Sequence, residues 1–148
     1  MKSLIIITTI LVIAGCNSKS DPSIEHLNSG KILPDNLPFS EAVRVDNMLY
    51  LSGQIGIIPG TLTLVSGGIE QETKQTMDNI KATLEEHGSS MDKLVKCMVM
   101  LTDLSEWPKF NEIYQQYFTI PYPARSAFGA NKLALGARVE VECMAVMK

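Results

Sequence analysis

The sequence predicts an α+β domain of two layers, with two helices on one face of a mixed sheet and the element order ββαβαββ. Three observations support this prediction. Two segments carry apolar residues three or four positions apart, which is the spacing of an amphipathic helix. Five segments alternate or run apolar as strands do. The chain has 148 residues, of which 45% are apolar and 20% charged, enough for one domain with its own core.

The first fifteen residues are predicted to be a signal peptide. One lysine precedes an apolar run at residues 4–14, which is too short to cross a bilayer but has the length of a signal-peptide core. The sequence Ile13-Ala14-Gly15-Cys16 resembles the lipobox of bacterial lipoproteins, in which a peptidase cuts before the cysteine and the cysteine is acylated. We therefore expect residues 1–15 to be removed and Cys16 to carry the lipid. A plain membrane anchor and a buried core segment are the alternatives.

A lipidated Cys16 places the domain at the bacterial cell envelope. More than one acyl chain gives durable membrane attachment, so we expect a lipid-anchored protein that faces the periplasm. Asn17 is not the aspartate that favours inner-membrane retention, and this favours the outer membrane. Residues 16–36 are polar and show no sustained period, so we predict the lipidated cysteine and a tether there, with the folded domain at residues 37–148.

The first elements of the domain are predicted to be a hairpin and a helix. Residues 42–45 and 48–52 flank Asp46-Asn47, two residue types that accept the positive φ of a tight turn. Residues 69–87 follow with an apolar stripe, and Gly88 suits the position just after a helix. The stripe consists of Ile69, Thr73, Met77, Ile80 and Leu84.

A strand, a second helix and two further strands complete the predicted order. Residues 94–101 are apolar except for one lysine, and residues 105–118 carry aromatic residues at helical spacing after a capping serine, Ser105. Residues 125–129 and 138–147 form the last strands. The faces expected toward the layer between helices and sheet hold Val95, Cys97, Val99 and Leu101, then Trp107, Phe110, Tyr114 and Tyr117, and finally Val139, Val141, Cys143 and Ala145.

Two of the three cysteines fall on apolar faces of predicted strands. Because Cys97 and Cys143 are expected in the core, the pattern favours buried free thiols. A disulfide between them stays open as an alternative, since an envelope compartment is oxidising.

Arg125 is the leading candidate for binding a substrate. It follows Pro123-Ala124 at the start of a predicted strand, and its planar guanidinium can grip a carboxylate through two parallel hydrogen bonds. We expect it on the sheet face away from the helices, together with Glu140 and Glu142. That half-polar face is expected to be covered by neighbouring subunits. The alternative is that Arg125 only pairs with one of the two glutamates.

Glu140 and Glu142 are the candidates for proton transfer. Two residues apart on a strand, they share a face at about 7 Å, which suits either a general base beside Arg125 or a solvated polar face. Gly53 at a strand end and Asn111 on a helix are weaker candidates, since both positions are common without a ligand. The chain lacks His/Cys/Asp spacings typical of metal sites and lacks phosphate-binding glycine motifs, so we expect no metal and no cofactor.

Five segments taken together resemble the Rid/YjgF family of reactive-intermediate (enamine/imine) deaminases, also called the L-PSP endoribonuclease family. The segments are AVRVDNMLYLSGQI, TLEEHGSSMDKLVKCMVMLTDL, FNEIYQQYF, YPARSAF and RVEVECMAV, and their order and spacing agree over residues 37–148. The resemblance implies a chorismate-mutase-like α+β fold that assembles as a homotrimer, with the sites in the clefts between subunits.

By the same resemblance, Arg125 matches the arginine that binds the substrate carboxylate, and Glu140 matches the glutamate that positions or activates water. The residues that match the lining of the cleft are Ser40, Gly53 and Asn111. The family's Gly-Pro-Tyr-Ser-Gln stands here as Leu-Pro-Phe-Ser-Glu at residues 37–41, so Phe39 replaces a tyrosine of the cleft. Ala127 stands where a cysteine commonly follows Arg-Ser.

The activity implied by the resemblance is hydrolytic deamination of small 2-imino or enamine acids, such as 2-aminoacrylate, to 2-oxo acids and ammonia. A non-catalytic trimeric module that binds small carboxylates at Arg125 is the alternative, and the changes at Phe39 and Ala127 favour it. Ribonuclease activity is disfavoured because the chain has a net charge of −3 and no basic run. The expected partners are a small carboxylate, further copies of the chain and a membrane through Cys16, but not nucleic acid.

Overall fold

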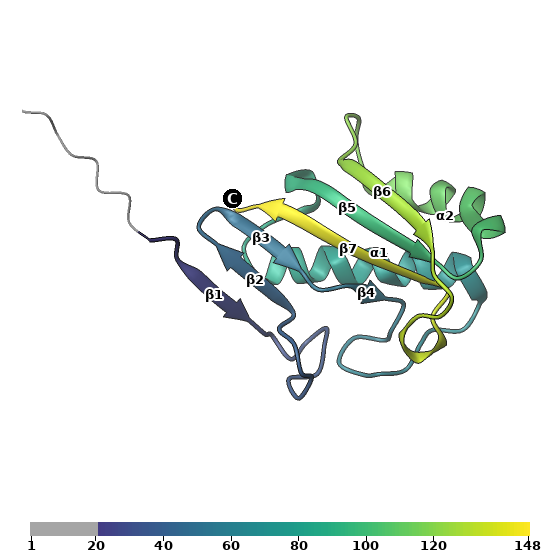
Figure 1. Cartoon of the computed structure of the whole chain (residues 1–148), viewed down its shortest axis with the longest axis horizontal. Helices are drawn as coiled ribbons and strands as arrows, with labels where there is room; N and C mark the ends of the chain where they lie inside the picture. Colours follow the sequence, from purple (N-terminus) through teal and green to yellow (C-terminus); the bar gives the residue numbers. More distant parts are fainter. Residues whose placement is uncertain (1–20) are drawn as a thin grey trace, which may run out of the picture.

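A computed structural model describes residues 21–148 and shows one mixed sheet backed by two helices (Figure 1). The sheet order is β1-β2-β3-β7-β5-β6, with the short β4 paired to β7. Only β5 and β6 run parallel, and every other pair is antiparallel. The strands are β1 (Ile24–Leu27), β2 (Ala42–Val45), β3 (Met48–Leu51), β4 (Gln54–Ile55), β5 (Leu94–Leu101), β6 (Ala124–Gly129) and β7 (Val139–Val146), and the helices are α1 (Gly68–Glu86) and α2 (Trp107–Tyr114). The predicted α+β class and the succession ββαβαββ are confirmed, with β1 and β4 added to them.

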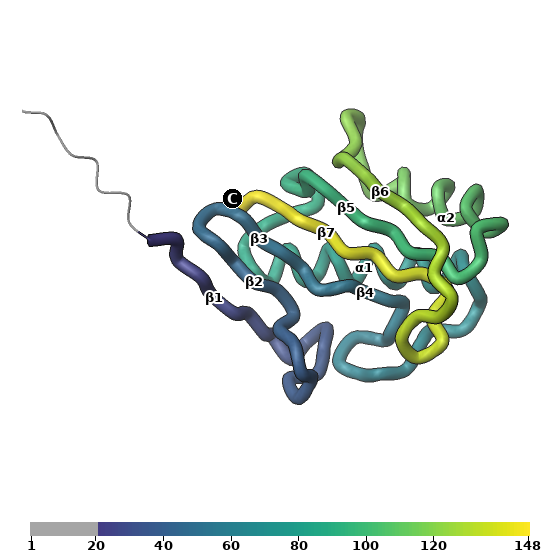
Figure 2. The backbone as a smooth tube through the Cα atoms, in the orientation of Figure 1, coloured from purple at the N-terminus to yellow at the C-terminus, as the bar shows by residue number. Residues whose placement is uncertain are grey.

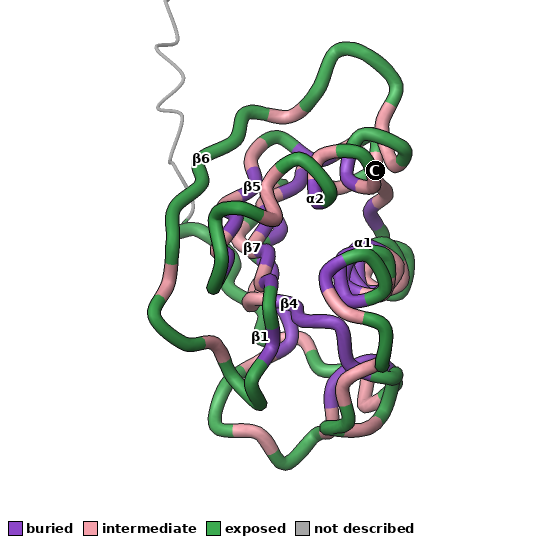
Figure 3. Tube along the Cα trace, turned by 90° about the vertical axis from the view of Figure 1, so that its right-hand side faces the viewer, coloured by how far each residue is buried: buried purple, intermediate pink, exposed green. Residues whose placement is uncertain are grey.

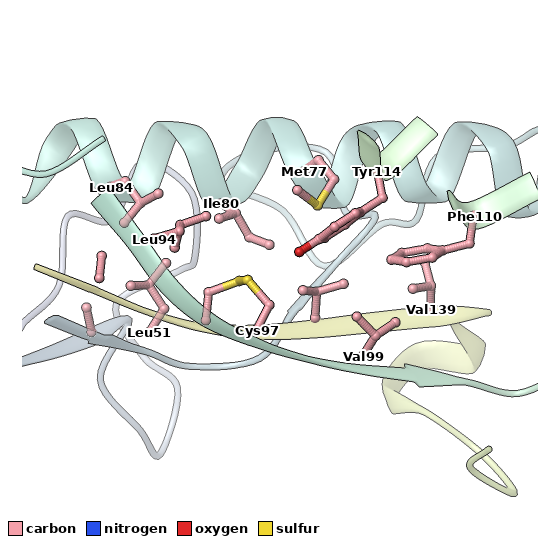
Figure 4. Close-up of a cluster of buried hydrophobic side chains, with 14 of the residues drawn as sticks. Leu51, Met77, Ile80, Leu84, Leu94, Cys97, Val99, Phe110, Tyr114 and Val139 are labelled. Atoms are coloured by element: carbon pink, nitrogen blue, oxygen red, sulfur yellow. A yellow bond between two sulfur atoms is a disulfide. The ribbon is translucent and has the colours of Figure 1, made fainter. Parts of the chain in front are cut away.

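The core lies between the two helices and the inner face of the sheet (Figure 4). All five residues of the predicted α1 stripe are buried, and they face the buried alternate residues of β5 and β7. Each fully buried aliphatic side chain of this kind stabilises the fold by about 1.5–3 kcal/mol. In Figure 3 the strands β5 and β7 contain buried residues, whereas the edge strand β6 is exposed along its whole length.

The predicted turns have the expected backbone conformations. Asp46 adopts a φ of 50° between β2 and β3, and Gly88 adopts a φ of 80° directly after the end of α1. The C-terminus returns to the same hairpin, where the backbone N–H of Met147 donates to the carbonyl of Asn47 at 3.0 Å (Figure 2). These contacts join the first and last parts of the domain.

The domain begins earlier than the sequence predicts. Within the expected tether, β1 pairs with β2 in the register His26↔Val43, and both Ile32 and Leu33 are buried. The prediction that residues 24–36 are a polar tether is therefore wrong. An edge strand is held by backbone hydrogen bonds, which leave no hydrophobic period to detect. The apolar run at residues 4–14 and Cys16 lie outside the described residues.

Two local predictions also need correction. Helix α2 is shorter than residues 105–118, with 3-10 turns on both sides, and Ser105 is not its cap: its backbone N–H donates to Asp103 Oδ1 at 2.9 Å. In β5 the register shifts between Leu94 and Lys96, so Val95 points outward and Leu94 takes its place in the core. A one-residue bulge exchanges the faces of a strand, and the apolar pattern alone does not locate it.

The cysteines of β5 and β7 form a disulfide, and the free thiols favoured by the sequence are wrong. Cys97 and Cys143 are direct partners in the register of the two strands, with their Cα atoms 4.2 Å apart and a bond between their sulfurs. The sequence pattern placed both on the inner face. Only the strand register decides that they are neighbours.

In the part of the chain that the structure describes, no helix is long and apolar enough to cross a membrane.

Candidate active site

Arg125 lies on the inner face of the sheet, beside α2. Its Cα pairs with that of Cys97, whose side chain points into the core, so both side chains leave the sheet on the same side. The guanidinium carbon of Arg125 lies 4.9 Å from the ring centre of Trp107 and 4.8 Å from that of Tyr114. The expectation that Arg125 shares the outer face with Glu140 is therefore wrong. The register between β5 and β6 fixes the face, and the sequence does not contain that register.

A pocket of about 440 Å³ opens beside the Arg125 side chain. Its walls come from α2, from the turn after α2 and from the loop that leads into β6. They consist of Asn111, Tyr114, Gln115, Tyr122, Pro123 and Arg125. Asn111, predicted as a site residue, is thus brought next to Arg125 by the fold.

Among residues 21–148, Arg125 is the only arginine whose side chain has no ion-pair partner. Arg44 lies 3.8 Å from Glu25, and Arg138 lies 2.6 Å from Glu106. The alternative that Arg125 only pairs with a glutamate of the sheet is therefore wrong. Its guanidinium has donors free to bind a carboxylate that enters the pocket.

Glu140 lies on the opposite, outer face of the sheet, in the part of β7 that pairs with β4. Its carboxylate covers Gly53, and a Cβ built on Gly53 would collide with Glu140 Oε1. A larger residue at position 53 would therefore have to displace the Glu140 carboxylate, whereas glycine lets it lie close to the backbone. Partial burial raises the pKa of the Glu140 carboxyl above its ordinary value, and the negative charge of Glu142 raises that pKa further.

Ser40 lies close to Gly53, because its backbone carbonyl is hydrogen-bonded to Ser52, the residue that precedes Gly53. The hydroxyl of Ser52 donates to the carbonyl of Ser40 at 2.7 Å, and the Ser40 hydroxyl lies 3.4 Å from His26 Nδ1. Phe39 precedes Ser40 and is 49% exposed. The predicted site residues therefore fall into two groups, one around Arg125 and Asn111 and one around Glu140, Gly53 and Ser40.

A buried carboxylate holds the segment that carries Phe39 and Ser40. Glu41, which stands where the family has a glutamine, is 1% exposed and accepts from the backbone N–H and the hydroxyl of Ser29. Its other oxygen lies 3.4 Å from Nε2 of His87, at the end of α1. Sequence reasoning did not find this contact, since the two residues are distant in the chain and neither forms a motif.

The aromatic side chains beside Arg125 were also missed as parts of the site. Trp107, Phe110 and Tyr114 were predicted as core residues of a helix, and Tyr122 was not among the predicted site residues. The sequence does contain a feature that could have identified them as site residues, because every position of this helical stripe is aromatic. Within residues 21–148, no three His, Cys, Asp or Glu side chains lie together as a metal site requires.

The sequence model of the family described as Endoribonuclease L-PSP matches residues 32–147. The chain belongs to this family. The resemblance to Rid/YjgF proteins is therefore confirmed, and the match begins at Ile32, within the segment predicted as a tether.

Curated and solved relatives agree with this membership. The human protein named 2-iminobutanoate/2-iminopropanoate deaminase is 42% identical over 109 residues, which are 74% of this chain and 80% of the human protein. The crystal structure of RidA from the Antarctic bacterium Psychrobacter sp. is 36% identical with a TM-score of 0.78, over 83% of this chain and 99% of that one. Escherichia coli TdcF with bound serine is 26% identical with a TM-score of 0.77, over 84% and 99% of the two chains.

Proposed function

We propose that the protein hydrolyses small 2-imino acids, and the enamine acids that tautomerise to them, to 2-oxo acids and ammonia. The observation that carries the proposal is the unpaired Arg125 in a pocket of amino-acid size, in a chain 42% identical to a human protein named for this reaction. A relative with bound serine supports a pocket for a small carboxylate of amino-acid type.

Arg125 supplies the substrate grip in this reaction. Its two forward N–H groups donate to the carboxylate, while the amide of Asn111 lies in the same pocket and can bond the substrate nitrogen. Binding of the carboxylate holds the imine carbon in a fixed orientation toward a water molecule. Such orientation is sufficient to accelerate the reaction of an imine that already hydrolyses in water.

Glu140 supplies the proton transfer. The oxygen of a water molecule bonds to the imine carbon, and Glu140 accepts one proton of that water and passes it to the nitrogen. The new hydroxyl then loses its proton to the nitrogen through the same carboxyl group, the C–N bond breaks, and ammonia leaves a 2-oxo acid. A carboxyl with a raised pKa suits both the acceptance and the return of the proton.

The proposed site joins two chains of a homotrimer. Arg125 and Glu140 leave one sheet on opposite faces, so a second copy has to bring its Glu140 to the first copy's Arg125. The outer face offers a surface for such packing, because apolar residues that are exposed or half-buried lie on the same face as Glu140. They are Val43, Tyr50, Met98, Met100 and Met144.

The protein is proposed to work at the cell envelope, attached by a lipid on Cys16. The lipobox-like sequence Ile13-Ala14-Gly15-Cys16 supports this location. The disulfide between Cys97 and Cys143 supports it independently, because disulfides persist in oxidising compartments outside the cytoplasm.

An imine-hydrolysis assay tests the activity. An amino-acid oxidase generates 2-iminopropanoate or 2-iminobutanoate in situ, and the loss of the imine is followed with the wild type, Arg125→Ala and the control Arg44→Ala. Arg44 is ion-paired on the surface at 3.8 Å, away from the pocket. We expect acceleration by the wild type and the control, and none by Arg125→Ala.

A wild type that does not accelerate any of several imines contradicts the enzyme. In that case a thermal shift with 2-oxobutanoate that disappears in Arg125→Ala supports the alternative, a non-catalytic module that binds small carboxylates. The replacements at Phe39 and Ala127 are the observations that favour this second candidate.

Subunit mixing tests the shared site. Inactive Arg125→Ala and inactive Glu140→Ala proteins, unfolded together and refolded as mixed trimers, should recover about one quarter of the wild-type sites, because each site takes one residue from each of two chains. No recovery in mixed trimers, or a monomer by light scattering, contradicts the intersubunit site.

Labelling with a radioactive fatty acid tests the anchor. We expect label and membrane fractionation for the wild type and neither for Cys16→Ala. A soluble, unlabelled wild type contradicts the envelope location and leaves the proposed reaction untouched.

A further inference from the structure

Three aromatic rings of α2 form a row next to Arg125, and one of them, Tyr114, also lines the pocket. Trp107, Phe110 and Tyr114 are spaced by three and four residues, so they share one side of the helix. Their ring centres are 5.5 Å apart from Trp107 to Phe110 and 5.4 Å apart from Phe110 to Tyr114. We call these three rings the aromatic platform.

The aromatic platform is held rigidly by the core. Phe110 is fully buried and Tyr114 is 4% exposed, and both pack against residues of α1 and the sheet (Figure 4). Trp107 lies at the outer end of the row and is partly buried. The rings therefore cannot move without disturbing the core.

The guanidinium of Arg125 lies on this aromatic platform. Its central carbon is 4.9 Å from the ring centre of Trp107, 5.8 Å from that of Phe110 and 4.8 Å from that of Tyr114. All three distances fall within the range of cation–π attraction, which is strongest for tryptophan. No other cation of residues 21–148 lies over an aromatic ring in this way.

The contacts of Arg125 differ in kind from those of Arg44 and Arg138. Each of those two arginines uses its N–H groups on protein oxygens: Arg44 on the carbonyl of Asp46 at 2.9 Å and Arg138 on Glu106 at 2.6 Å. Within the described residues, Arg125 makes only face contacts with rings. A face contact fixes the plane of a guanidinium and leaves the N–H donors at its edge unused.

We propose that Trp107 and Tyr114 are positioning residues, which hold the Arg125 guanidinium flat so that its donor edge faces the pocket and receives the carboxylate of the ligand. The inference rests on the proposed function for the identity of the ligand, but the contact itself does not depend on it. A preorganised arginine loses less conformational freedom on binding, so the aromatic platform increases carboxylate affinity without touching the carboxylate.

Three variants of the full chain test the role of Trp107. Trp107→Leu keeps an apolar side chain and removes the ring, and Trp107→Phe restores a ring. Phe118→Leu is the matched control, since the ring of Phe118 lies tilted against that of Tyr114 with the ring centres 4.7 Å apart and packs against the same core, but is not one of the rings over which the Arg125 guanidinium lies. The dissociation constant of 2-oxobutanoate, KM and kcat are measured for each variant.

For Trp107→Leu we expect the dissociation constant and KM to rise about five- to tenfold with kcat changed less than about twofold. Trp107→Phe should recover most of the affinity. Phe118→Leu should lower the melting temperature as much as Trp107→Leu does and leave the affinity unchanged. Equal affinity in Trp107→Leu and the wild type, or equal losses in both leucine variants, overturns the proposal.

A spectroscopic signature separates this inference from the proposed reaction. Protons held over aromatic rings resonate upfield, so the Nε–H and Cδ protons of Arg125 should be shifted in the wild type and return toward ordinary positions in Trp107→Leu. If the shift is present but no imine is hydrolysed, the proposed reaction fails and the positioning role stands. If the shift is absent in the folded wild type, the positioning role fails even when the enzyme is active.

Discussion

The two faces of the sheet carry two half-sites that are built differently. On the inner face, Arg125 lies on aromatic rings, has no ion-pair partner and borders a pocket of about 440 Å³. On the outer face, Glu140 is half-buried over Gly53 and lies near Glu142. One chain therefore holds both the proposed binding half and the proposed proton-transfer half, but on opposite faces of its sheet.

If the proposed roles hold, this difference places ligand binding on the inner face of the sheet and proton transfer on its outer face. Changes on the inner face should act on affinity, because that half is the one proposed to bind the ligand. Changes on the outer face should act on the rate of the chemical step and on its pH dependence. The predictions below test this separation, beginning with a change to the bond that joins the strands next to both halves.

Removal of the disulfide should have the largest effect, and the effect should be on stability. The bond joins β5, whose Cys97 pairs with Arg125, to β7, which carries Glu140. The double variant Cys97→Ala/Cys143→Ala should lower the free energy of unfolding by about 4 kcal/mol, because the unfolded chain regains the freedom of a 46-residue loop. Chemical denaturation checks the value.

Below the melting temperature of this double variant, kcat/KM should stay within about twofold of the wild type, since neither sulfur borders the pocket. A selective loss of kcat with full stability would show that the disulfide serves the outer half-site instead.

Arg125→Lys should lower kcat/KM about 100-fold. Lysine keeps the charge but loses the planar fork and the flat contact with the rings of Trp107 and Tyr114. The loss should be mainly in KM and in the dissociation constant of 2-oxobutanoate. Steady-state kinetics and calorimetry measure it, with Arg44→Lys as the control. Near-wild-type affinity in Arg125→Lys would mean that charge alone binds the ligand.

Glu140→Gln should lower kcat about 30-fold and change the 2-oxobutanoate affinity less than about twofold. The amide fills the same space over Gly53 but cannot accept the proton of water. The factor is smaller than for many general bases, because a small imine hydrolyses without help. An equal loss of affinity and rate would remove the distinction between the two halves.

Glu142→Gln should have the smallest effect, a shift of the acid limb of the kcat profile to lower pH. Burial and then the charge of Glu142 raise the pKa of Glu140, so removal of that charge lowers the pKa and the base becomes available at lower pH. The control Glu25→Gln removes an exposed carboxylate next to Arg44 and should leave the profile in place. A shift to higher pH would contradict the assignment of Glu140 as the base.

Much of the fold was predictable because short-range patterns encode it. The stripe of α1, the alternation of β7, the turn at Asp46 and the helix end at Gly88 all follow from periodicity or from backbone preference. The edge strand β1 was not predictable in this way, since its partner supplies its stability and its own side chains are mostly exposed.

The candidate site was predictable as a set of residues but not as an arrangement. Arg125, Asn111, Gly53 and Glu140 were found from their chemistry and from the family resemblance. Their division between two faces was not, because it depends on the pairing of Arg125 with Cys97 and of Glu140 with Met100 across strands distant in sequence.

The sequence by itself determined the α+β class, the chemical groups of the site and a net charge that disfavours nucleic acid. These properties depend on residue type and on local spacing. The tertiary structure alone decided that Cys97 meets Cys143, that the Arg125 guanidinium lies on aromatic rings, and that Glu140 faces away from it. Strand register decides all three, and register is a property of the assembled sheet, set by core packing along its whole length rather than by any one segment.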